Sequence, residues 1–192
     1  MSSTAASPVE FEEIAELILT ELVRTLAAVN PAETSAAQQL ILAGKRVFVT
    51  GSGRSGLAMR MAAMRLMHLG LIVHVAGEVT TPALAKNDVL LIASGSGTTA
   101  SAVLAAETAR KVGACVIALT AARHSRLTEL ADAVLFIPAA TKQDHNGSVS
   151  QQYAGALFEQ SVLLVMDSLF QQMWQARGET AEQLWTRHAN IE

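Results

Sequence analysis

Apolar residues along the chain alternate between short continuous runs and segments in which they recur every three or four positions. A short run rich in β-branched residues is typical of a buried strand, and the longer spacing is typical of a helix with one apolar face. The predicted strands span 46–50, 71–75, 89–93, 115–119 and 133–137. Because helices separate most of them, the pattern predicts an α/β fold: a five-stranded parallel sheet with helices on both faces, doubly wound and flavodoxin-like.

The N-terminal part of the chain precedes this alternation and is predicted to be helical. Ser7 and Pro8 suit the N-cap and the first position of a helix, which the Asn30-Pro31 pair ends, and a second, shorter helix follows. We therefore expect two parts: a helical appendage over 1–44, and an α/β domain with C-terminal helices over 45–192.

Composition narrows the class of protein. Apolar residues make up 51% of the 192 residues and charged residues only 16%, which predicts a folded chain whose surface is partly covered by other subunits. The net charge of −3, with no basic block, argues against nucleic acid as a partner. Cys115 is the single cysteine, so no disulfide framework forms within one chain, and a reducing, cytoplasmic location is expected.

No segment of the sequence has the character of a membrane span or a secretory leader. Residues 1–7 are small and polar, and the apolar runs, such as 162–166, are far shorter than the ~20 residues that cross a bilayer. We therefore expect no membrane partner.

A glycine-rich loop at 51–56 follows the first predicted strand and opens a helix. Its sequence, G-S-G-R-S-G, matches the dinucleotide fingerprint G-x-G-x-x-G, with Glu78 as a loose candidate for the acidic residue that would hold a ribose. However, Arg54 and Ser55 add a cation and a hydroxyl that a turn built to approach a pyrophosphate does not need. An NAD-binding module therefore stays an alternative.

A second loop, S-G-S-G-T-T at 94–99, follows the third predicted strand and opens another helix. Hydroxyls and free backbone N–H groups at a helix N-terminus form a cradle for a phosphate monoester, and the lack of a lysine excludes a nucleotide P-loop. Both loops fall at the carboxyl end of the sheet, where open α/β folds bind ligands. The candidate substrate-binding residues of the two loops are Gly53, Arg54, Ser55, Ser94, Gly95, Ser96, Gly97, Thr98 and Thr99.

The second loop resembles the signature of SIS (sugar isomerase) domains. Other segments resemble one family within that group, the 6-phospho-3-hexuloisomerases, and the resemblance runs from about Phe48 to the end of the chain. Its narrowest segments are M-R-L-M-H-L-G at 64–70 and R-H-A-N at 187–190. The segment 152–159 departs from the pattern: it reads Q-Y-A-G-A-L-F-E where the family usually has Q-P-M-G-T-L-F-E.

Glu159 is the candidate catalytic base. Moving a carbonyl along a sugar requires a base that takes a proton from the neighbouring carbon. Glu159 is the only formally charged residue between Asp144 and Asp167, on a helix predicted over 151–177. A buried carboxylate is costly unless it is paired or functional, and the alternative is a glutamate on the solvent face of the helix. The resemblance to the family's L-F-E base favours the catalytic role.

The five histidines are too scattered for a metal-ligand pattern. His188 lies in the R-H-A-N run, and the resemblance implies that it assists ring opening or proton transfer from a neighbouring subunit. His68 is a candidate substrate-binding residue, although a histidine near a helix C-terminus is also explained by the helix dipole.

The resemblance implies an enzyme that isomerises 3-hexulose 6-phosphate to fructose 6-phosphate through an enediol, as in the ribulose monophosphate pathway of formaldehyde fixation. It implies no cofactor and no metal, a small sugar phosphate as partner, and a homotetramer. Two further alternatives stay open: another SIS isomerase, such as one acting on arabinose 5-phosphate, or a non-catalytic SIS protein that binds sugar phosphates.

Overall fold

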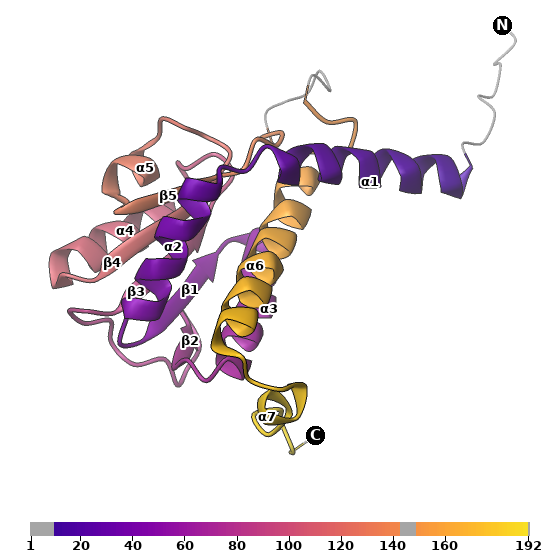
Figure 1. The fold of residues 1–192 in the computed structure, drawn as a ribbon. Helices are drawn as coiled ribbons and strands as arrows, with labels where there is room; N and C mark the ends of the chain where they lie inside the picture. The colour runs from indigo at the N-terminus through magenta and orange to yellow at the C-terminus, as the bar shows by residue number, and fades with distance from the viewer. Residues whose placement is uncertain (1–9, 143–148, 192) are drawn as a thin grey trace, which may run out of the picture.

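The structure is a computed structural model that describes residues 10–142 and 149–191 (Figure 1). In chain order its elements are α1 (Phe11–Ala27), α2 (Pro31–Ala43), β1 (Val47–Gly51), α3 (Gly53–His68), β2 (Val73–Val75), β3 (Val89–Ala93), α4 (Ala100–Val112), β4 (Cys115–Thr120), α5 (Arg126–Leu130), β5 (Ala133–Phe136), α6 (Ala156–Arg177) and α7 (Ala181–Trp185). The predicted helix start at Ser7 and Pro8 lies outside the described residues.

The five strands form one parallel sheet in the order β2-β1-β3-β4-β5, with Val49 paired to Leu91 and Leu91 to Ile117. After β1 the chain moves to the β2 edge and then returns past β1 to β3. The doubly wound α/β fold predicted from the sequence is confirmed. The reversal between β1 and β3 matters for function, because open sheets of this kind bind ligands beyond the strand ends at such a point.

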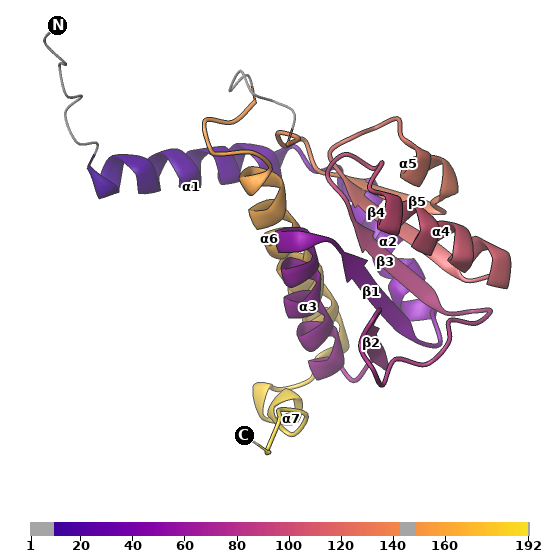
Figure 2. The ribbon, with the colours of Figure 1, turned by 180° about the vertical axis from the view of Figure 1, so that it is seen from behind.

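Alternate residues of β1, β3 and β4 enter two separate cores. Val49, Leu91 and Leu119 face the larger core, which α2, α3 and α6 cover. Phe48 and Ile92 face a smaller core under α4 and α5. This alternation follows from the two-residue period of a strand, and it explains why strands buried on both faces read as continuous apolar runs. Figure 1 shows α2 and α6 in front of the sheet, and Figure 2 shows α4 on the opposite face.

The two N-terminal helices differ in how they meet the sheet. Ala37 and Ile41 of α2 are fully buried in the larger core, and the Asn30 side chain caps the helix by accepting from the N–H of Ala32. In contrast, α1 packs on α6 and extends away from the sheet (Figures 1 and 2). The division of the chain at residue 44 stays a prediction. Although α2 belongs to the predicted appendage, it packs in the larger core of the α/β domain.

The helix predicted over 151–177 begins later, at Ala156, so this prediction of its start was wrong. Ala154 has a φ of 52° and Gly155 is the N-cap, which ends the turns that precede the helix. Long-range contacts hold these turns: the Ser150 hydroxyl and the Gln151 N–H both donate to the buried Glu21 carboxylate of α1, at 2.7 Å. The late start places Glu159 in the first turn of α6.

Burial disfavours the charged form of Glu21, but its hydrogen bonds outweigh this effect and lower its pKa. The charge of the buried Glu21 carboxylate is therefore stabilised by hydrogen bonds from Ser150 and Gln151, which gives this residue a structural role. None of the helices within the described ranges has both the length and the hydropathy of a membrane span.

Candidate active site

A cavity of about 240 Å³ lies at the carboxyl end of the sheet, where three helices begin. The N-cap residues of α3, α4 and α6, which are Ser52, Thr99 and Gly155, all line it, and none gives its helix a side-chain cap. The first N–H groups of a helix have no partner within the helix, so these groups are available to a ligand. Three positive helix ends therefore favour an anion in this cavity.

The loop after β3 forms one wall of the cavity. Ser94, Gly95, Ser96 and Thr99 line it, and the Ser94 and Thr99 hydroxyl oxygens lie 3.0 Å apart. Thr98 lies outside the lining and donates its hydroxyl to Ser96 at 3.1 Å. The hydroxyls predicted to bind phosphate are therefore brought together, with Thr98 as a supporting contact.

Gly97 also lies outside the lining, and it determines the shape of this loop. It has a φ of 64°, and a β-carbon at this position would lie 2.1 Å from the Ser125 hydroxyl oxygen. Only glycine combines this left-handed conformation with so close a neighbour. Its role in the structure is to shape the turn.

The loop after β1 forms the adjoining wall. Ser52 and Ser55 line the cavity, and the Ser52 hydroxyl lies 3.1 Å from that of Ser101, which joins this loop to α4. A β-carbon on Gly56 would lie 2.4 Å from the Gly51 carbonyl oxygen, so the strand and helix meet too closely there for a side chain. Gly53, with a φ of 59°, starts α3 without lining the cavity.

Glu159 lies inside the cavity, with 8% of its side chain exposed. The Arg54 Nε lies 2.9 Å from its Oε2 atom, while the Arg54 side chain is 64% exposed and lies outside the lining. The alternative of a solvent-facing glutamate is therefore wrong. The guanidinium of Arg54 neutralises and orients this carboxylate from outside the cavity, and Glu159 stays the predicted base.

The structure places both histidine candidates at the opposite end of α3. His68 is buried there, and its ring stacks on that of the exposed His188 with the ring centroids 3.9 Å apart. Burial lowers the pKa of His68, and the nearby His188 and Arg65 add to the effect. Ser55 and His68 stand roughly 20 Å apart along α3, at ~1.5 Å per residue. Neither histidine lines the cavity of its own chain.

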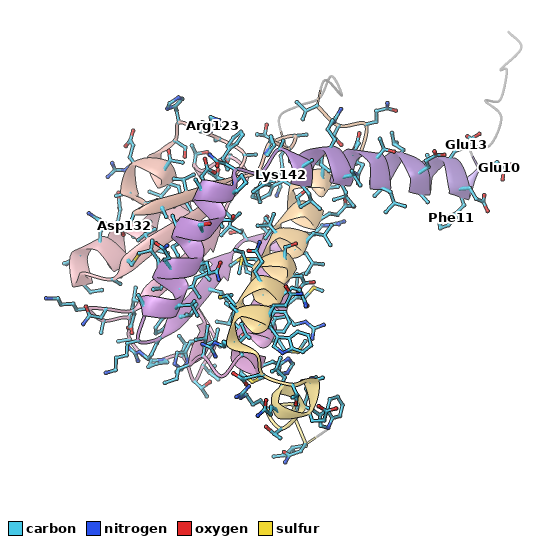
Figure 3. The ribbon with its side chains drawn as sticks, in the orientation of Figure 1. Glu10, Phe11, Glu13, Arg123, Asp132 and Lys142 are labelled. Carbon is cyan, nitrogen blue, oxygen red and sulfur yellow. The ribbon has the colours of Figure 1, made fainter. Side chains whose placement is uncertain are left out.

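Three polar residues of the cavity and one helix end were missed from the sequence: Ser52, Thr141, Lys142 and the N-terminus of α6. Lys142 comes from the connection that follows β5, and Figure 3 labels it near the start of α6. Its position after a parallel strand was the available signal, because all strand ends of this sheet meet at one edge. In the described part of the chain, no group of three or more His, Cys, Asp or Glu side chains is placed to hold a metal ion.

Comparison with known proteins identifies the family of this chain. The SIS domain family model matches residues 40–161. A 3-hexulose-6-phosphate isomerase from Mycobacterium gastri is 53% identical over 176 residues, which cover 92% of this chain and 88% of that relative. The enzyme of the same name from Bacillus subtilis is 38% identical over 182 residues, 94% of this chain and 98% of that relative.

A solved structure from Methanococcus jannaschii, for which a molecular function of 3-hexulose-6-phosphate isomerase was inferred, has a TM-score of 0.80 at 26% identity and covers 94% of this chain and 99% of that one. The class of protein is thus an SIS-domain sugar-phosphate isomerase. Within that class, the chain belongs to the family of 3-hexulose-6-phosphate isomerases, which confirms the resemblance found in the sequence.

Proposed function

We propose that this chain isomerises 3-hexulose 6-phosphate to fructose 6-phosphate. The observation that carries the proposal is the buried carboxylate of Glu159 in a cavity on which three helix N-termini converge. This arrangement meets the two needs of the reaction, an anion site for the phosphate and a base for the sugar carbons. The identity to curated relatives of that name supports the substrate.

The phosphate is held by the hydroxyls of Ser94, Ser96, Thr99 and Ser55 together with the N–H groups that start α3 and α4. Fixing the phosphate positions the far end of the sugar, so binding energy remote from the reacting carbons lowers the barrier. Glu159 then takes the proton from carbon 2 and returns it to carbon 3, through an enediol between these carbons. The test is formation of fructose 6-phosphate from the purified chain, designed in the Discussion.

We further propose that the enzyme is a cytoplasmic homotetramer in which His188 serves the cavity of another copy. Exposed apolar side chains support an oligomer: Phe11, Leu19 and Val23 along one face of α1 are 80%, 62% and 68% exposed. His188 is exposed at the far end of α3, where a second copy can meet it. The proposed reaction places the enzyme in formaldehyde fixation by the ribulose monophosphate pathway, with no nucleic acid or membrane partner.

Sharing of the site between copies predicts complementation. We expect His188→Asn and Glu159→Gln to be inactive separately, and a mixture refolded together to recover fructose 6-phosphate production, because a mixed oligomer contains a site with both native residues. The control mixes Glu159→Gln with the double variant, which assembles no complete site. Mixed oligomers are identified by a tag on one variant. If these mixed oligomers stay inactive, His188 does not act across copies.

A further inference from the structure

Lys142 is a cation of the cavity that the two phosphate loops do not include. The chain has four lysines, at 45, 86, 111 and 142, and Lys142 alone among them lines this cavity. Its side chain reaches the cavity from the connection after β5, on the side where α6 begins (Figure 3).

The Lys142 side chain and the proposed base both lie near Gly155. Its Cε atom and the Glu159 Oε1 atom each lie 3.9 Å from the point where a β-carbon on residue 155 would stand, and its Cγ atom lies 3.4 Å from the same point. Because residue 155 is glycine, no β-carbon occupies this point, and both side chains line the same cavity. Because Lys142 and Glu159 line one cavity of about 240 Å³, a sugar held there can meet both the Glu159 carboxylate and the Lys142 ammonium, one bond beyond Cε.

The other charges at the site already have partners. The guanidinium of Arg54 contacts Oε2 of Glu159 from outside the lining, so it is not placed to face the sugar. In the proposed function, neutral hydroxyls of the cavity lining and the N-termini of α3 and α4 bind the phosphate. Within the described ranges, no hydrogen bond or ion pair joins the Lys142 ammonium to another residue.

We infer that Lys142 is a catalytic residue that stabilises the negative charge on the oxygens of the enediolate form of the intermediate; this rests on the proposed function. Glu159 takes the proton of carbon 2, the electrons of that C–H bond form the C2–C3 double bond, and the carbonyl electrons move to oxygen 3. The Lys142 ammonium donates a hydrogen bond to that oxygen and keeps its proton. The hydroxyl proton then moves from oxygen 2 to oxygen 3, and Glu159 returns its proton to carbon 3 as the carbonyl forms at carbon 2.

A hydrogen-bond donor that is already in place stabilises negative charge as it develops on the sugar oxygen. Because this charge is absent from the bound substrate and forms only during the reaction, the donor raises kcat. We expect Lys142→Ala to lower kcat for 3-hexulose 6-phosphate about 100-fold while KM changes less than about threefold. Lys142→Arg keeps a cation and is expected to retain more activity than the alanine variant. Lys111→Ala, on the surface of α4, is the matched control and should leave both constants unchanged.

Two further readouts separate this role from phosphate binding and from a structural effect. The inhibition constant of inorganic phosphate should be the same in Lys142→Ala and in the native enzyme, and added methylamine should restore part of the lost kcat. A raised inhibition constant with an unchanged kcat would overturn the inference and make Lys142 a phosphate ligand. Native kcat in Lys142→Ala would also overturn it, whereas a native chain that forms no fructose 6-phosphate would instead refute the proposed function.

Discussion

Replacing Glu159 with glutamine is expected to lower kcat by about 10³-fold or more and to leave the fold intact. The amide has nearly the shape of the carboxylate and keeps an oxygen for the Arg54 contact, but it cannot take a proton from carbon. The two measurements are the rate of fructose 6-phosphate formation and the midpoint of urea unfolding. The exposed Glu129→Gln, which has an ion pair with Arg126, is the matched control and should keep native activity.

The result also separates Glu21 and Glu159, the two buried glutamates among the described residues. Glu21 has its charge met by the chain segment before α6, whereas Glu159 faces the cavity. Nearly normal turnover in Glu159→Gln would remove Glu159 as the base, whatever the effect on stability.

Replacing Thr99 with valine is expected to weaken substrate binding 10- to 100-fold, seen as a rise in KM. Thr99 is the N-cap of α4, yet its hydroxyl does not cap the helix and instead lies beside that of Ser94 at the cavity wall. A hydrogen bond to a charged group contributes about 1.5–3 kcal/mol, which corresponds to this range. The inhibition constant of inorganic phosphate should rise by a similar factor.

Thr98→Val provides the control for this change, since the same chemical substitution is made one position away. Thr98 lies outside the lining, and its hydroxyl contacts only Ser96 among the described residues. We expect a much smaller rise in KM, below about threefold. Equal effects at the two positions would place the phosphate elsewhere in the cavity.

The strands and both glycine loops could be predicted from the sequence because each carries a local signal. The run 89–93 was predicted with the bounds of β3, and the hydroxyls that follow it do line the cavity. Parallel strands bring their carboxyl ends to one edge, so the loops after β1 and β3 meet without any further information.

The start of α6 could not be predicted, because contacts distant in sequence determine it. Residues 151–155 are compatible with a helix, but the Glu21 carboxylate accepts a hydrogen bond from the Gln151 N–H, and Ala154 takes a left-handed conformation. The third helix N-terminus at the cavity could therefore not be predicted, and neither could the place of Lys142 in the same cavity as Glu159. The separation of His68 from the cavity depends on the length and direction of α3, which the sequence motif alone does not reveal.

The most direct test of the proposed function is a coupled assay on the purified chain. 3-Hexulose 6-phosphate is supplied, and any fructose 6-phosphate formed is converted to glucose 6-phosphate and oxidised, with NADPH absorbance as the signal. We predict NADPH formation that depends on the native chain and is lost with Glu159→Gln. No signal from 3-hexulose 6-phosphate, together with isomerisation of arabinose 5-phosphate by the same preparation, would contradict the proposed substrate.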